Sequence, residues 1–181
     1  MKFFKKLALF LAATAAAAYL IFWTFESFGL DNPFFAFLVN WLVMSWVAIV
    51  GQAVPFSFPA GYYQIQSFER TGRIYERLGV HLFKKLVRRG PLAVFNPKLR
   101  LPKERTLSAL QNLEGEMRNA ETAHLFIFLV MLLFTGYALF QGWFATAGWF
   151  LLFNLLLNGY PVMLQRYNRI RLQQLIRRQA A

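Results

Sequence analysis

The chain contains no cysteine, and only two of its 181 residues are histidines, His81 and His124. The lack of cysteine excludes disulfide bonds, thiol nucleophiles and thiolate metal sites. Two histidines alone are too few to build a zinc site. The sequence therefore predicts no metal site, and we also expect no bound cofactor.

Acidic residues are scarce as well. Asp and Glu together number 8 against 20 Lys and Arg, which gives a formal net charge of +12. Such a balance first suggests nucleic acid as a partner, but no nucleic-acid fold signature is present and the basic residues alternate with long apolar runs. An anionic lipid surface is the more natural partner, at about 1 kcal/mol per basic residue near the surface. We therefore expect membrane lipids, and no nucleic acid, as partners.

The apolar runs decide the fold class. Hydrophobic residues make up 57% of the chain, which is more apolar surface than a water-soluble domain of this size can bury. A helix needs about 20 apolar residues to cross about 30 Å of hydrocarbon. Four runs meet this requirement, and they predict an all-α integral membrane protein that forms a single domain over residues 1–181. The predicted spans are residues 7–25, 34–54, 123–140 and 143–164.

The basic residues also predict an orientation. All 20 fall at the amino terminus, in the loop 55–122 or in the tail 165–181, and the short links between paired spans carry none. Positive loops face the cytoplasm. We therefore expect a multi-pass protein with both termini and the loop 55–122 in the cytoplasm.

The first run has an alternative interpretation. Its Lys-rich start and alanine tract are also typical of a signal peptide, although the apolar run is long for one. We interpret residues 7–25 as an uncleaved span. Cleavage would leave three spans in the same orientation.

The loop 55–122 is predicted to lie on the membrane surface. Apolar and basic residues alternate at mostly helical spacing in its first half, which favours amphipathic interfacial helices. Gly72 and Gly79 should divide these helices into short pieces. The proline-containing stretch 90–102 is predicted to be irregular, and a helix over 103–120 should continue into the third span.

Glu121 and His124 are the first candidates for chemistry. They are three positions apart, so their side chains share one helical face at the start of the third span. A carboxylate beside an imidazole suits a general base that acts on a hydroxyl. The same pair could instead make a structural hydrogen bond, because an acid-x-x-His spacing is a weak motif. His81 is expected to be an interfacial side chain, and Glu69 and Glu76 to form ordinary surface ion pairs.

Polar residues also gather where the fourth run ends. Arginines bind phosphate or carboxylate through paired donors, and amides can orient a carbonyl or a sugar hydroxyl. The alternative is a helix end whose arginines only reach into anionic headgroups. This predicted polar patch consists of Gln165, Arg166, Tyr167, Asn168 and Arg169.

Three asparagines lie within or near the predicted spans. Asn40, Asn154 and Asn158 are expected to form hydrogen bonds between helices, each worth about 0.6 kcal/mol. A direct contact with a substrate is the alternative.

Three separated segments resemble one family of small bacterial membrane enzymes. They are Phe-Glu-Arg-Thr-Gly-Arg-Ile-Tyr-Glu at 68–76, Arg-Asn-Ala-Glu-Thr-Ala-His at 118–124, and Tyr160-Pro161 followed by Gln-Arg-Tyr-Asn-Arg-Ile-Arg-Leu at 165–172. In order and spacing they are similar to the glycosyl-4,4′-diaponeurosporenoate acyltransferase family, which acts on carotenoid glycosides.

The resemblance implies a membrane acyltransferase in a bacterial cell (inner) membrane. It would transfer a fatty acyl group from acyl-CoA or acyl-carrier protein to a hydroxyl of a lipid-linked glycoside of the carotenoid type. Glu121 and His124 become the catalytic acid/base pair. The substrate-binding set becomes Gln165, Arg166, Tyr167, Asn168, Arg169, Arg118, Glu69 and Arg73.

Two other functions remain open from the residues. A non-catalytic lipid-binding membrane protein, or a subunit of a larger assembly, would also explain the spans and the basic loop. A transporter is disfavoured, because the spans contain no clear intramembrane charge. The oligomeric state is not predicted.

Overall fold

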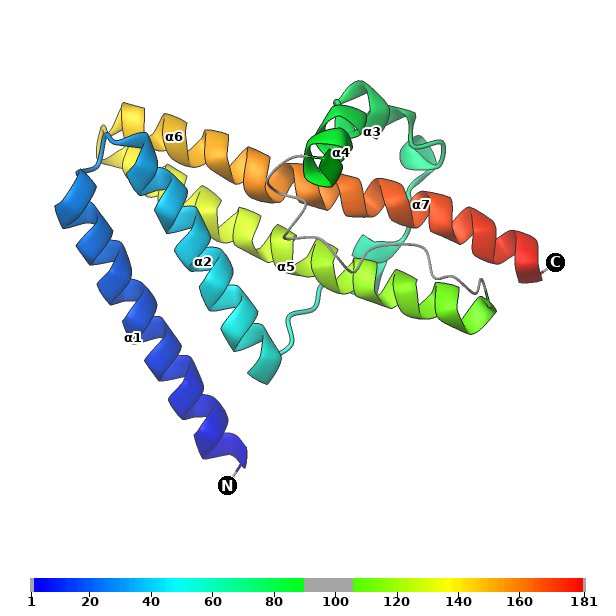
Figure 1. The fold of residues 1–181 in the computed structure, drawn as a ribbon, viewed down its shortest axis with the longest axis horizontal. Helices are drawn as coiled ribbons and strands as arrows, with labels where there is room; N and C mark the ends of the chain where they lie inside the picture. Colours follow the sequence, from blue (N-terminus) through cyan, green and yellow to red (C-terminus); the bar gives the residue numbers. More distant parts are fainter. Residues whose placement is uncertain (1, 90–105, 181) are drawn as a thin grey trace. The chain divides into compact units, whose positions relative to one another are not determined.

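The structure is a computed structural model that describes residues 2–89 and 106–180. Within these ranges the chain is helical and contains no strand, which confirms the predicted all-α class (Figure 1). Short 3₁₀ turns, η1 (Ala60–Tyr63) and η2 (Ser67–Glu69), and a π-helix, η4 (Leu155–Gly159), separate the longer elements. The α-helices are α1 (Lys2–Phe28), α2 (Pro33–Ala53), α3 (Arg73–Arg77), α4 (Val80–Arg89), α5 (Leu107–Phe140), α6 (Phe144–Asn154) and α7 (Tyr160–Ala180).

Four helical stretches among the described residues are long and apolar enough to cross a membrane, which confirms the integral membrane class. They are Phe3–Phe28, Pro33–Ala53, Leu107–Phe140 and Phe144–Gln179. The last two are 34 and 36 residues long, well beyond the ~20 that a bilayer requires. The predicted continuation of the helix 103–120 into the third span is confirmed, since α5 is unbroken from Leu107 to Phe140, whereas residues 103–105 lie outside the described residues.

Local sequence signals fix the ends of these helices. Pro33 occupies the first turn of α2, where its missing N–H costs nothing, and the Asn32 side chain accepts a 2.9 Å hydrogen bond from the N–H of Phe34. Gly142 has a φ of +76° in the tight turn after α5. This turn confirms the predicted short link between the third and fourth spans.

The described residues form two compact units. The bundle unit comprises Met1–Ser57 and Ala123–Gly159, and the loop unit comprises Phe58–Thr122 and Tyr160–Ala181. The predicted single membrane domain concerns the chain in its bilayer and stays a prediction.

The bundle unit has an apolar core supplied by α2, the second half of α5, and α6. Val39, Met131 and Phe150 are among its buried members. Helix α1 packs on α2, where the indole N–H of Trp46 donates to Thr14 Oγ1 at 3.0 Å. Most of α1 is exposed and apolar, as expected of a helix that faces lipid.

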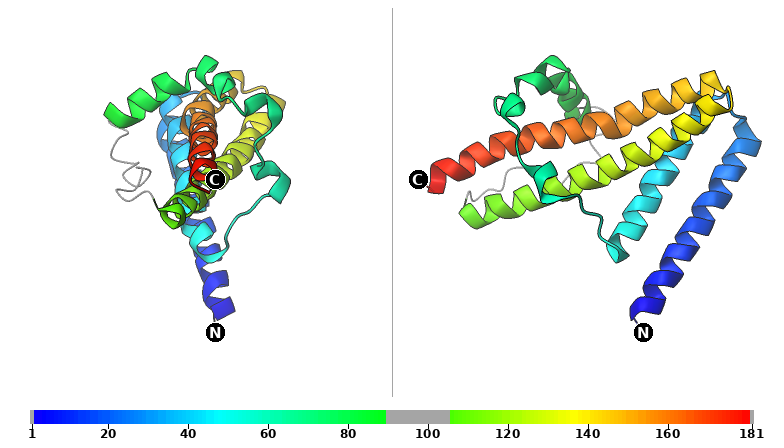
Figure 2. Two further views of the ribbon diagram at one scale, coloured as in Figure 1. Left: turned by 90° about the vertical axis from the view of Figure 1, so that its right-hand side faces the viewer. Right: turned by 180° about the vertical axis from the view of Figure 1, so that it is seen from behind.

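The loop unit packs its short helices on α7, as the two views of Figure 2 show. Tyr75, Val80 and Phe83 contact Ile170 and neighbouring residues of α7 in one apolar cluster. Gly72 and Gly79 separate η2, α3 and α4, and both have positive φ, 73° and 80°. The predicted interruptions are thus confirmed, whereas the predicted irregular stretch 90–102 lies outside the described residues.

Candidate functional site

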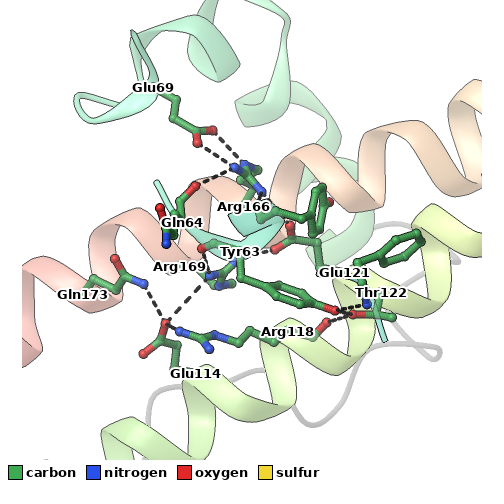
Figure 3. Close-up of polar contacts among 12 residues, drawn as sticks. Tyr63, Gln64, Glu69, Glu114, Arg118, Glu121, Thr122, Arg166, Arg169 and Gln173 are labelled. Atoms are coloured by element: carbon green, nitrogen blue, oxygen red, sulfur yellow. Dashed lines mark hydrogen bonds and ion pairs between the residues drawn. The ribbon is translucent and has the colours of Figure 1, made fainter. Parts of the chain in front are cut away.

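A buried network of ion pairs occupies the loop unit, and Arg166 on α7 is its centre (Figure 3). Arg166 Nε donates to Glu69 Oε2 at 2.8 Å, and Nη2 donates to Glu69 Oε1 at 2.7 Å. This bidentate arrangement is the strongest that a guanidinium makes with a carboxylate. It joins α7 to the 3₁₀ turn η2, which lies 97 residues earlier in the chain.

The other N–H groups of Arg166 are also occupied. Nη1 donates to the carbonyl of Tyr62 at 2.8 Å and to Glu121 Oε1 at 3.1 Å, and Nη2 donates to the carbonyl of Gln64 at 3.0 Å. A guanidinium has five N–H donors, and protein atoms satisfy all of them here. Arg166 therefore organises the loop unit and has no donor left for a ligand.

Arg169 forms the second half of the network, one turn of α7 further on. Its Nη1 donates to Glu121 Oε2 at 2.6 Å, and its Nη2 donates to the carbonyl of Tyr63 at 2.7 Å. Arg169 and Glu121 are both fully buried. Glu69 and Glu121 thus balance the charges of Arg166 and Arg169, as buried charges require, and Glu114 Oε1 lies a further 3.9 Å from Arg169 Nη2.

Glu69 shows where the sequence interpretation was wrong. It was expected to form an ordinary surface ion pair, but it is only 1% exposed. Burial alone would raise the pKa of Glu69, yet hydrogen bonds from Arg166, from the Tyr75 hydroxyl and from the N–H of Gln66 favour the carboxylate. Together they hold its pKa below the ordinary range. Burial and the carboxylate of Glu69 both raise the pKa of Tyr75, so this hydroxyl keeps the proton that it donates.

A second, more exposed cluster surrounds Glu76. Its Oε1 accepts hydrogen bonds from the Tyr167 hydroxyl at 2.9 Å and from Arg171 Nη2 at 3.2 Å. The Tyr167 bond is the main cause of the lowered pKa of Glu76. His81 Nε2 lies 3.6 Å from the same oxygen, a partner that the sequence interpretation missed. Tyr167, a member of the predicted binding set, is therefore engaged within the protein.

The remaining members of the predicted binding set have diverse surroundings. Asn168 accepts a 3.4 Å hydrogen bond from Lys84. Gln165 is buried, and its Oε1 has no hydrogen-bond partner among the described residues. Arg73 is exposed and has no ion pair within the described part of the chain. Arg118 pairs with Glu114 at 2.9 Å and remains 45% exposed at its side chain.

A cavity of about 560 Å³ lies in the loop unit beside this network. Its lining combines guanidinium and amide groups with a few apolar side chains, a donor set suited to an anionic polar ligand. Arg118 was predicted, but Arg70 and Arg177 were not, because nothing in their spacing relates residues so far apart. The lining residues are Ala60, Tyr63, Gln64, Ile65, Arg70, Arg118, Ile170, Gln173, Gln174 and Arg177.

The network holds one wall of this cavity in place. The carbonyls of Tyr63 and Gln64 accept hydrogen bonds from Arg169 and Arg166, and both residues line the cavity. The Tyr63 hydroxyl is also hydrogen-bonded to Thr122 Oγ1 at 2.6 Å. Arg166 and Arg169 therefore position cavity residues and do not themselves line the cavity.

His124 lies in the bundle unit, and its hydrogen-bond partner is not Glu121 but Asn158. Its Nδ1 is 3.3 Å from Asn158 Oδ1, whereas Glu121 uses both carboxylate oxygens on arginines. The catalytic roles of both residues stay predictions. The expected interhelical bonds of the asparagines are confirmed, since Asn158 donates to Asn40 and Asn154 donates to the carbonyl of Phe128.

A match to a family model shows which protein family the chain belongs to. The model for glycosyl-4,4′-diaponeurosporenoate acyltransferase matches residues 59–178, which is more than half of the chain. The chain belongs to this family. No curated protein and no solved structure matches it.

The glycosyl-4,4′-diaponeurosporenoate acyltransferase match includes every residue of the buried network and of the cavity, together with His124 and Asn158. It leaves out α1 and α2. Among residues 2–89 and 106–180, no three His, Cys, Asp or Glu side chains could hold a metal ion together.

Proposed function

We propose that the chain is a membrane-bound acyltransferase that moves a fatty acyl group onto a sugar hydroxyl of a glycosylated isoprenoid of the carotenoid type. The family match carries this proposal, because the family is named for acyl transfer to a glycosylated carotenoid acid. The four apolar helices support it, since an acceptor with a long apolar tail can stay in hydrocarbon while only its sugar is presented.

His124 is the proposed general base. Its Nε2 removes the proton from the sugar hydroxyl while the hydroxyl oxygen attacks the carbonyl carbon of an acyl thioester. A C–O bond forms and the C–S bond breaks, and the departing sulfur takes the proton back from His124. Base catalysis of this kind is worth about 10²- to 10⁴-fold in rate.

The cavity of the loop unit is the proposed site for the anionic part of the acyl donor. Coenzyme A and the prosthetic group of acyl-carrier protein both carry phosphate, and Arg70, Arg118 and Arg177 offer guanidinium groups to it. Arg70 and Arg177 make no ion pair within the described residues, so their donors are available. In this proposal Glu69, Glu121, Arg166 and Arg169 act indirectly, by holding Tyr63 and Gln64 in the cavity wall.

The reaction is proposed to take place at the cytoplasmic face of a bacterial cell membrane, where both termini would lie. The distribution of the basic residues supports this orientation, because none lies in the short links between paired spans. Acyl thioesters are cytoplasmic metabolites, so the donor would reach the loop unit from that side.

The test compares two histidine variants in cells that make the glycosylated acceptor. His124→Ala should abolish acylated glycolipid in a mass-spectrometric lipid profile at an unchanged level of membrane-inserted protein. His81→Gln, the matched control, should leave the profile unchanged because His81 lies in the exposed cluster around Glu76. Equal acylation in wild type and His124→Ala would reject His124 as the base. A profile without acylated product in any of these strains would favour a non-catalytic lipid-binding protein.

A further inference from the structure

The bundle unit contains a chain of buried amides that ends on His124. Asn40, Asn154 and Asn158 are each 0% exposed and come from α2, α6 and the π-helix η4. Asn158 Nδ2 is 3.3 Å from Asn40 Oδ1 and 3.0 Å from Asn154 Oδ1, and Asn158 Oδ1 is 3.3 Å from His124 Nδ1. Buried polar groups of this kind are hydrogen-bonded because an unsatisfied group is costly.

Two backbone carbonyls determine the direction of each hydrogen bond in this series of buried amides. Asn40 contacts the carbonyl of Ala36 at 3.1 Å, and Asn154 contacts the carbonyl of Phe128 at 3.0 Å. A carbonyl oxygen can only accept, so each of these asparagines must present its NH₂ group to it. The Oδ1 atoms of Asn40 and Asn154 then face Asn158. This conclusion does not depend on how the amide of Asn158 is oriented.

Asn158 has one way to satisfy both neighbours. Because Asn40 and Asn154 offer it oxygens, Asn158 must donate with its NH₂ group, and its own Oδ1 is left facing His124. The ring nitrogen opposite an acceptor must carry a proton. A neutral imidazole has only one N–H, so Nε2 must then be the bare nitrogen.

We propose that Asn158 is a positioning residue that holds His124 as the Nδ1–H tautomer, which leaves Nε2 as the base. This inference rests on the proposed function for its catalytic meaning, because it supplies the nitrogen that acyl transfer needs. Asn158 takes the place that the sequence interpretation gave to Glu121. No described residue hydrogen-bonds Nε2 of His124, so this nitrogen is free to accept a proton.

The backbone around Asn158 is built for this contact. Asn158 lies in a π-helix, a rare and wider turn that frequently occurs at functional sites. Gly159, next in the chain, allows the turn to approach α5. A Cβ at this position would lie 2.9 Å from Leu155 Cδ1 and 3.3 Å from Cε2 of Phe128, one turn beyond His124. A side chain here would require the Leu155 side chain to move and the Phe128 ring to shift by a few tenths of an ångström.

Nitrogen-15 NMR of the full chain in lipid nanodiscs tests the tautomer directly. In a His81→Gln background, His124 is the only histidine, so its two ring nitrogens can be assigned without ambiguity. The expected spectrum has a protonated Nδ1 and a bare Nε2 in the neutral ring. A neutral ring protonated at Nε2 would overturn the proposal, and this measurement needs no change within the amide chain.

Two substitutions at position 158 test whether the asparagine is responsible. Asn158→Leu removes the acceptor, so the ring should lose its preference for Nδ1–H and kcat should fall at least about tenfold with KM unchanged. Asn158→Asp loses the two hydrogen bonds that the amide donates but keeps an acceptor for the ring, so Nδ1 should stay protonated. An unchanged tautomer in Asn158→Leu would show that another group holds the ring and would overturn the proposal.

The outcomes separate this inference from the proposed function. If wild type shows the Nδ1–H tautomer but His124→Ala retains acyl transfer, the assignment of the amide chain stands and the role of His124 as the base falls. If His124→Ala is inactive but the neutral ring is protonated at Nε2, the base stands and the positioning role of Asn158 falls.

Discussion

The two units bury polar groups of different kinds. In the bundle unit the buried polar side chains are neutral, Asn40, Asn154 and Asn158 with a few threonines, whereas the loop unit buries Glu69, Glu121 and Arg169. A neutral amide can be buried with two or three hydrogen bonds, but a charge also needs a counter-charge. The removal of one polar partner should therefore destabilise the loop unit more than the bundle unit.

The largest effect is expected from Glu121→Gln in the loop unit. The change keeps the shape of the side chain but leaves the fully buried Arg169 without its closest counter-charge. Breaking a buried ion pair in this way costs about 3–5 kcal/mol. Denaturant unfolding in mixed micelles measures the loss, followed by far-UV circular dichroism because all five tryptophans lie in the bundle unit. Glu116→Gln makes the same change at an exposed site of α5 and should have no effect, and equal unfolding midpoints for the two variants would contradict the buried network.

A smaller, pH-dependent effect is expected from Glu69. Its pKa in the folded protein is held below its ordinary value of 4.5, so the carboxylate stabilises the fold above that pH and the stabilisation is lost as the pH falls through the lowered pKa. Wild type should therefore lose stability in acid, and Glu69→Gln should be less stable at neutral pH and lose less between about pH 5 and pH 3. Unfolding midpoints across this range provide the measurement. Parallel pH curves for the two proteins would argue against an ionised Glu69.

Asn40→Leu in the bundle unit should cost less than either change to a charge. It removes the acceptor for one N–H of Asn158, and that amide keeps its second acceptor on Asn154. Hydrogen bonds between helices in membranes are worth about 0.6 kcal/mol and at most about 1.7 kcal/mol. Unfolding in the same micelles should show a loss in this range. A loss as large as that of Glu121→Gln would remove the distinction between the two units.

The smallest effect is expected from Arg171→Gln, in the exposed cluster around Glu76. Arg171 is about half exposed, and water and salt screen its 3.2 Å contact with Glu76. The unfolding midpoint should not change measurably, and it should not depend on salt concentration more than that of wild type. A clear destabilisation at low salt would show that this cluster belongs with the buried network.

Sequence reasoning predicted the helices better than their contacts. The apolar runs and the glycines at positions 72, 79 and 142 are local signals, and the structure places helix ends where they occur. The burial of Glu69 depends on Arg166, 97 residues away, and the partner of His124 lies 34 residues further along the chain. Helical periodicity relates residues three or four positions apart, so it cannot predict contacts between residues this far apart in the sequence. The π-helix that brings Asn158 to His124 has no sequence signal beyond Gly159 and Pro161.

Gly72 gives the shared segment at 68–76 a physical meaning. Its φ is +73°, and a Cβ there would lie 2.9 Å from Cε2 of Tyr167, so both the backbone angle and the ring exclude every side chain larger than hydrogen. In a saturation library at position 72, only glycine should be tolerated. The residue in the segment 68–76 that is hardest to replace is thus Gly72, which has no side chain and no functional group.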